Sequence, residues 1–360
     1  MYAFRAEEEM FAGQTRESMT WAERALELAA RFGDDEIRIM ALHIRGDARC
    51  THGDPGGLDD LRAALLLAEH EAGAGQVIES HTYLADWVSA YDGPRAGIAL
   101  DTAALEVASR RRAVNRGQWA KAGALRMLFE AGEWDRLLTW AGELIEAGPE
   151  RVDSSVLLTA RVARLGVLTL RGRLEVVDDP DELIEASETT GEVQTTAPAL
   201  VAAATLDVAR GRSDAAAAAL MAFERVTRDV APIYRESLLT DAVRPCLAIG
   251  RPDLAELLLT DARGITPRDR LYAAAATAAL DEAAGRTADA HQGYEDAVAR
   301  WRAFGCVVEE AFAQVGRART ARATDDLEVS ADLAAARATF AELGARPMVD
   351  TIDALNDGRT

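Results

Sequence analysis

The chain has 360 residues, a formal net charge of −20 and a sequence pI near 4.7. Duplex nucleic acid is bound through a basic surface, so this acidic balance excludes it as an expected partner. The three cysteines (Cys50, Cys246 and Cys306) form neither a CxxC pair nor a disulfide framework, and we find no long apolar run and no basic, apolar leader. We therefore expect a cytoplasmic protein that does not contact a membrane.

Helical segments alternate with short turns along the whole chain. Sustained period-2 alternation is absent, so no strands are expected. In chain order, we expect helices at Met1–Phe11, Trp21–Arg31, Glu36–Arg49, Leu58–His70, Gln76–Tyr91, Ala96–Arg112, Gln118–Glu130, Trp134–Glu146, Ser154–Leu170, Asp181–Thr189, Val193–Ala209, Asp214–Arg228, Tyr234–Ile249, Asp253–Arg263, Arg268–Ala284, Ala288–Phe304, Val307–Ala321, Asp326–Leu343 and Met348–Leu355.

A turn glycine recurs between the two helices of each predicted pair. These glycines are separated by 40, 40, 39, 40, 39, 39 and 35 residues, and a turn without glycine follows at Arg322-Ala323-Thr324. A fixed period in this range is typical of a helical solenoid, in which each repeat packs on its neighbours. We expect one repeat array over residues 1–346 and a capping helix with a tail over residues 347–360. The turn glycines are Gly13, Gly53, Gly93, Gly132, Gly172, Gly211, Gly250 and Gly285.

The best-defined repeat places Ala290, Tyr294 and Ala297 on one helix face after its turn. This small–large–small pattern, which recurs at Ala255-Leu259-Ala262, resembles the tetratricopeptide repeat (TPR). With a period of 39–40 residues, the chain resembles the C-terminal repeat region of large bacterial ATPase regulators of the MalT-like group. The segments Trp301–Gly305 and Thr339–Pro347 are similar to that group. The resemblance implies an all-α, right-handed superhelix of about eight or nine helix pairs. HEAT and armadillo arrays have similar periods and remain an alternative.

Three local patterns have a structural and a functional interpretation. Asp178–Glu182 contains a DDxxE spacing that can hold a metal ion, but Pro180 within it favours a helix start with acidic capping residues. His43 and Cys50 share a helix face without the close, paired spacing of a zinc site. The basic run Arg110–Arg112 is typical of a last helical turn, and a contact with a phosphate or an acidic partner is its alternative. We expect no metal and no cofactor.

The glycine register places a set of aromatic side chains on the predicted concave face. In the TPR-like register, this face carries the positions 13, 10, 6 and 3 residues before each turn glycine. Ordinary packing between helices is one interpretation, because aromatic rings fill large gaps. The other is a groove for a peptide or small ligand. The predicted centre of that groove consists of Tyr83, Trp87, Trp119, Arg126 and Phe129.

These patterns predict a non-catalytic interaction scaffold or regulatory sensor. Its expected partner is a protein or peptide, or a small effector, bound on the concave face. Two alternatives stay open: an all-α enzyme with an acidic metal site near Asp178–Glu182, and a structural, self-associating array. The sequence does not contain a nucleotide-binding GxxxxGK[ST] loop or a nucleophile motif such as GxSxG. The oligomeric state is left open.

Overall fold

The structure is a computed structural model that describes residues 1–11, 14–175, 178–321 and 326–357. Over these residues the chain forms 20 α-helices and no strand, which confirms the predicted all-α class. The first helices of the pairs are α1 (Tyr2–Phe11), α3 (Asp35–Thr51), α5 (Ala74–Asp92), α7 (Val114–Glu130), α9 (Ser154–Leu170), α11 (Val193–Ala209), α13 (Ile233–Glu236) with α14 (Leu239–Ala248), α16 (Pro267–Ala283) and α18 (Val307–Thr320). The second helices are α2 (Thr15–Phe32), α4 (Gly57–Glu71), α6 (Pro94–Arg110), α8 (Trp134–Ala147), α10 (Pro180–Thr190), α12 (Ser213–Thr227), α15 (Pro252–Leu259), α17 (Thr287–Phe304) and α19 (Asp326–Leu343), and α20 (Arg346–Asn356) follows the last pair.

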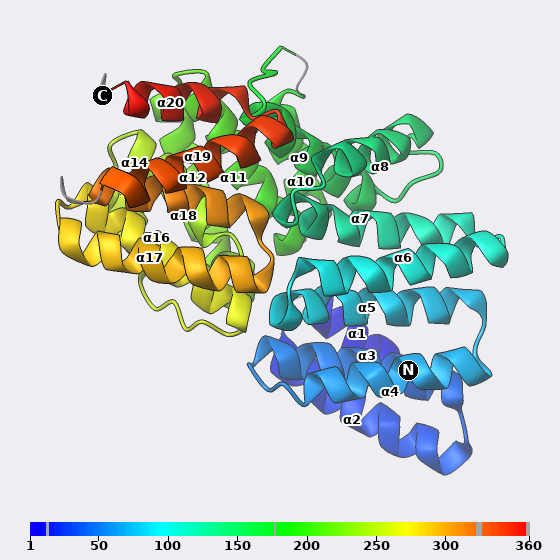
Figure 1. The fold of residues 1–360 in the computed structure, drawn as a ribbon. Helices are drawn as coiled ribbons and strands as arrows, with labels where there is room; N and C mark the ends of the chain where they lie inside the picture. Colours follow the sequence, from blue (N-terminus) through cyan, green and yellow to red (C-terminus); the bar gives the residue numbers. More distant parts are fainter. Residues whose placement is uncertain (12–13, 176–177, 322–325, 358–360) are drawn as a thin grey trace.

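The helix pairs stack in chain order into a superhelical array. Each first helix packs on its own second helix and on the first helix of the next repeat, from α1 on α3 through to α16 on α18. Figure 1 shows the pairs following one another from the N-terminal α1–α4 to the C-terminal α17–α20. This neighbour-to-neighbour packing is how a solenoid builds a long core from short units. No helix in the described part of the chain is long and apolar enough to cross a membrane.

The turn glycines have the backbone conformation that the repeat register requires. All seven that lie in the described residues have positive φ, from +71° at Gly211 to +99° at Gly93. Glycine adopts these angles without the steric cost of a β-carbon, so it can end the first helix and start the turn. The predicted turns at Gly13 and at Arg322-Ala323-Thr324 lie wholly or partly outside the described residues.

Two repeats depart from the regular pattern. The segment predicted as one helix at Tyr234–Ile249 is divided into α13 and α14, with the break at Ser237 and Leu238. In the fifth repeat, α10 starts late, as predicted: Pro180 is its first residue, and the Asp179 side chain accepts a hydrogen bond from Asp181 N. Proline fits this position because the first helical N–H has no partner within the helix. The helix predicted at Met348–Leu355 lies within α20.

Alanine and leucine fill the core between the helices. The predicted small–large–small face is buried, since Ala290, Tyr294 and Ala297 are 0%, 5% and 2% exposed. The ring of Tyr294 occupies the space left by Gly316 on α18, where an added β-carbon would lie 2.4 Å from the ring. Small side chains thus let adjacent helices approach, and one ring fills the gap between them.

The superhelix closes on itself along a line that we call the seam. At the seam, α5 contacts α16 and α7 contacts α18, and each of these pairs is five positions apart in the stack of first helices. Next along the seam, α9 contacts α20, the helix that follows the last pair. The seam follows four turn glycines, and a β-carbon added at each would meet a residue from a later repeat. The pairs are Gly53 with Ile265, Gly93 with Phe304, Gly132 with Leu343 and Gly172 with Pro347.

Candidate functional site: the seam cleft and the inner polar clusters

Two of the predicted groove residues, Tyr83 and Trp87, lie on α5 against α3. The Trp87 indole is 7% exposed, and its Nε1 donates a hydrogen bond to Asp47 Oδ1 at 2.9 Å. Burial raises the pKa of Asp47 to about 6, and this hydrogen bond opposes the shift. The half-buried Tyr83 ring stacks on His43 at 5.0 Å. Trp87 therefore donates to the half-buried Asp47 carboxyl group, while Tyr83 packs between repeats.

The other three residues, Trp119, Arg126 and Phe129, lie on α7 in different surroundings. Trp119, near the start of the helix, is 45% exposed. The Phe129 ring is half-buried and stacks on Trp134 at 5.5 Å, and the Arg126 guanidinium carbon lies 5.8 Å from the Phe129 centroid. The structure thus brings Arg126 and Phe129 together, and Trp119 carries the most exposed ring of the five.

Arg126 is bound by side chains from the far side of the seam. Its Nη1 donates to Asp241 Oδ2 at 2.7 Å, and its Nη2 donates to the Tyr272 hydroxyl at 2.7 Å. Its Nε donates to Glu130 Oε1 at 2.9 Å, and Glu130 also accepts the Tyr272 O–H at 2.8 Å. Glu130 is 1% exposed. These charge-assisted hydrogen bonds connect α7 to α14 and α16, so Arg126 holds two turns of the superhelix together.

Another carboxyl group, that of Asp101, is buried between α5, α6 and α7. Asp101 is 0% exposed, and no described residue forms a hydrogen bond with either of its carboxyl oxygens. Burial, with a smaller repulsion from Asp86, raises the pKa of Asp101 to about 9. A β-carbon added at Gly123 would lie 3.6 Å from an oxygen of each aspartate, so this glycine leaves space beside both carboxyl groups.

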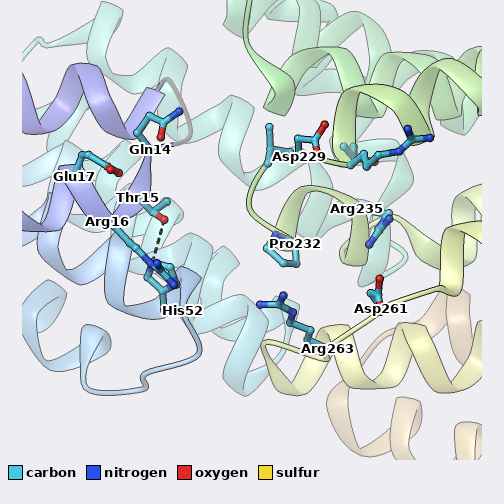
Figure 2. A pocket seen from close by; sticks show the side chains of 13 residues that line it. Gln14, Thr15, Arg16, Glu17, His52, Asp229, Pro232, Arg235, Asp261 and Arg263 are labelled. Atoms are coloured by element: carbon cyan, nitrogen blue, oxygen red, sulfur yellow. Dashed lines mark hydrogen bonds between the residues drawn. The ribbon is translucent and has the colours of Figure 1, made fainter.

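A polar cleft opens at the N-terminal end of the seam. Its volume is about 570 Å³, which is within the usual range for small-ligand sites. Figure 2 shows its two walls facing each other, one from the start of α2 and the α3–α4 turn, and one from the α12–α13 and α15–α16 connections. We call this space the seam cleft. It is lined by Gln14, Thr15, Arg16, Glu17, His52, Thr227, Arg228, Asp229, Val230, Pro232, Arg235, Asp261 and Arg263.

The position of the seam cleft follows from the repeat geometry. The nearest contact across the seam is that between Gly53 and Ile265. Thr227, which lines the cleft, precedes Ile265 by 38 residues, about one repeat. The cleft therefore lies one repeat before this contact along the seam, where the first repeat faces the end of α12. At this step the two turns of the superhelix leave space between them.

The first wall is held by a hydrogen bond between repeats. Thr15 Oγ1 and His52 Nε2 are 3.0 Å apart, which fixes the start of α2 against the α3–α4 turn. On the opposite wall, the Glu236 carboxylate accepts backbone N–H groups at Arg263 and Gly264, at 2.6 and 2.8 Å. This buried contact orders the α15–α16 connection that carries Arg263.

Three arginines in the seam cleft have no carboxylate partner among the described residues. Arg228 is paired with Glu224 at 2.6 Å, but no ion pair holds Arg16, Arg235 or Arg263 within the described part of the chain. The Arg235 Nη2 donates to Thr260 O at 3.3 Å, and its Nε is buried with no hydrogen-bond partner among the residues that the structure describes. These guanidinium groups keep N–H donors that no group of residues 14–175, 178–321 or 326–357 accepts.

The three local patterns with two interpretations have structural roles in the folded chain. Arg161 contacts both Asp178 and Glu182, and Asp179 caps α10, so the DDxxE segment is an ion-paired helix start. Over the described residues, no group of three His, Cys, Asp or Glu side chains is placed to hold a metal ion. Cys50 is buried, and burial raises its thiol pKa to about 12. Of the basic run, Arg110 is the last residue of α6 and Arg111 caps it, whereas Arg112 lies beyond the helix, so the predicted last helical turn holds only for Arg110.

Neither a protein-family model nor a curated protein matches the chain. The candidate site therefore depends on the geometry described above. Sequence patterns did not indicate Arg16, Arg235 or Arg263, because each stands alone in a turn or at a helix end. The available signal was the repeat period itself, which places residue 227 about one repeat before residue 265 along one side of the seam.

Proposed function

We propose that this protein is a non-catalytic regulatory sensor of the cytoplasm that binds a small effector in the seam cleft. The observation that carries the proposal is that the two walls of the cleft come from residues 14–52 and 227–263, which belong to different turns of the superhelix. A ligand that contacts both walls would couple its own binding to the closure of the superhelix.

The packing of the first helix pair supports this coupling. The helices α1 and α2 contact each other and α3, whereas α5, α7 and α9 also contact later helices across the seam. The first pair therefore has fewer restraints than the repeats behind it. A ligand that binds only the closed arrangement stabilises it by RT ln(1 + [L]/Kd), which is about 2.7 kcal/mol at a ligand concentration of 100 Kd.

The sensor would report its state to a protein or peptide partner. The resemblance to TPR-like and MalT-like repeat regions supports a regulatory partner of this kind. Trp119 is the most accessible ring of the predicted groove centre, and exposed tryptophan is a common anchor for a partner. Tyr83, Trp87, Arg126 and Phe129 would shape the surface behind it through their packing between repeats.

The proposal is tested by a thermal-shift screen of chemically diverse metabolites, followed by hydrogen exchange with each compound that stabilises the protein. The expected result is slower exchange on both walls, at residues 14–17 and 227–235, together with slower exchange in α1. Thr15→Val, which removes the hydroxyl group facing His52, should weaken the effect. Thr20→Val, at an exposed position later in α2, is the matched control. The sensor proposal is refuted if none of the stabilising compounds protects both walls.

A further inference from the structure

We infer that the seam cleft is a binding site for a small organic oxyanion, with its phosphate or carboxylate group held between Arg16 and the pair Arg235 and Arg263. This inference rests on the proposed function, because it names the chemistry of the effector in the same cleft. The ligand class follows from these guanidinium groups, for which the described residues provide no carboxylate partner, since arginine binds planar carboxylate and phosphate groups through two parallel hydrogen bonds.

The second wall supplies two of these groups. Arg263 is exposed, and its backbone is ordered by Glu236, so its side chain extends from a fixed connection into the cleft. Figure 2 shows the side chains of Arg235 and Arg263 on the same wall, with Pro232 beside them. A buried guanidinium Nε without an acceptor costs free energy, and a ligand oxygen can supply that acceptor once the side chain adjusts.

The first wall supplies the opposing contact. Arg16 is exposed in the first turn of α2, next to the Thr15–His52 hydrogen bond. The hydroxyl of Thr15 and the amide of Gln14 add neutral polar groups for the rest of a ligand. An oxyanion bridging Arg16 and Arg263 would join α2 to the α15–α16 connection. The proposed effector must join these two walls of the cleft in order to close the superhelix.

The acidic side chains of the cleft limit the charge of the ligand. Glu17, Asp229 and Asp261 are exposed and remain hydrated, so they impose no need for a bound cation. They would repel a ligand with several negative groups spread along its length. The geometry therefore favours a compact ligand with one or two oxyanion groups, in a protein whose net charge of −20 otherwise disfavours anions.

The test is isothermal titration calorimetry of the full chain with inorganic pyrophosphate and with citrate, which separates phosphate from carboxylate recognition. Saturable binding that weakens with salt is expected for at least one of them. Arg263→Gln and Arg235→Gln should each weaken it tenfold or more, and Arg16→Gln should do the same from the opposite wall. Arg300→Gln, an exposed substitution on α17 away from the cleft, should leave binding unchanged.

Three results would overturn the inference: no saturable binding of either anion, equal binding by the cleft variants and the control, or no effect of Arg16→Gln. Glucose and spermidine serve as neutral and cationic probes in the same titration and in hydrogen exchange. Protection of both walls by either of these probes would refute the oxyanion chemistry and leave the sensor proposal standing. If protection of both walls is seen neither with the four probes nor in the metabolite screen, the sensor proposal fails as well.

Discussion

Gly93 lies at the tightest point of the seam, and replacing it with alanine should open this contact. Its φ and ψ are 99° and 162°, a region that residues with a β-carbon rarely adopt. The new β-carbon would lie 2.2 Å from the Phe304 carbonyl oxygen and 3.3 Å from its carbonyl carbon. A carbon–oxygen contact is normally at least about 3.3 Å, so the two backbones would have to separate by roughly 1 Å.

The matched control is Gly285→Ala. Gly285 occupies an equivalent turn with φ of +74°, but an added β-carbon there would meet no atom of the described residues within 4 Å. This substitution should cost only the left-handed backbone strain, about 1–2 kcal/mol. Gly93→Ala carries backbone strain of ~1–3 kcal/mol together with the loss of seam packing, so we expect it to be more destabilising by about 2 kcal/mol or more.

Urea unfolding followed by circular dichroism measures both costs, and hydrogen exchange locates the change. Gly93→Ala should speed exchange at the α17–α18 junction, about 210 residues away in sequence, whereas Gly285→Ala should not affect the α5–α6 turn. Equal losses of stability in the two variants, with no faster exchange at the α17–α18 junction, would show that the seam contact contributes nothing.

Three further predictions concern the inner clusters and the core. Trp87→Phe should lower the free energy of unfolding in urea by about 1–3 kcal/mol, because Asp47 loses its hydrogen-bond donor. Trp119→Phe, at an exposed position, should change it by less than ~0.5 kcal/mol. Similar losses in the two variants would contradict a buried Trp87 and an exposed Trp119. The pKa of Asp101 is raised to about 9 in the folded state, so its contribution to stability is present below its unfolded pKa of about 4 and is lost as the pH rises through 9. Asp101→Asn should therefore reduce the fall of the melting temperature between pH 5 and 9. An unchanged slope of melting temperature against pH would refute this assignment. Ala290→Leu should cost ~1–3 kcal/mol by overpacking a fully buried position, and the exposed Ala288→Leu on the same helix should be nearly neutral in the same assay.

The sequence by itself determined the local architecture of this protein. Helix–turn–helix units, the positive φ of Gly93 and Gly285, and the capped start of α10 at Asp179 all follow from interactions within a few residues. Glycine, proline and aspartate act there through backbone sterics and nearby hydrogen bonds, which a single sequence exposes directly. The buried small–large–small face at Ala290, Tyr294 and Ala297 followed equally from helical periodicity.

Only the tertiary structure decided which repeats meet across the seam. That outcome depends on the small rotation between successive helix pairs, which accumulates over five repeats and which no local pattern encodes. It gave Arg126 partners at Asp241 and Tyr272, 115 and 146 residues away, and it left a cleft at the first repeat. Sequence patterns could place Arg126 on a helix face, but its partners and the arginines of the cleft are set by the pitch of the whole superhelix.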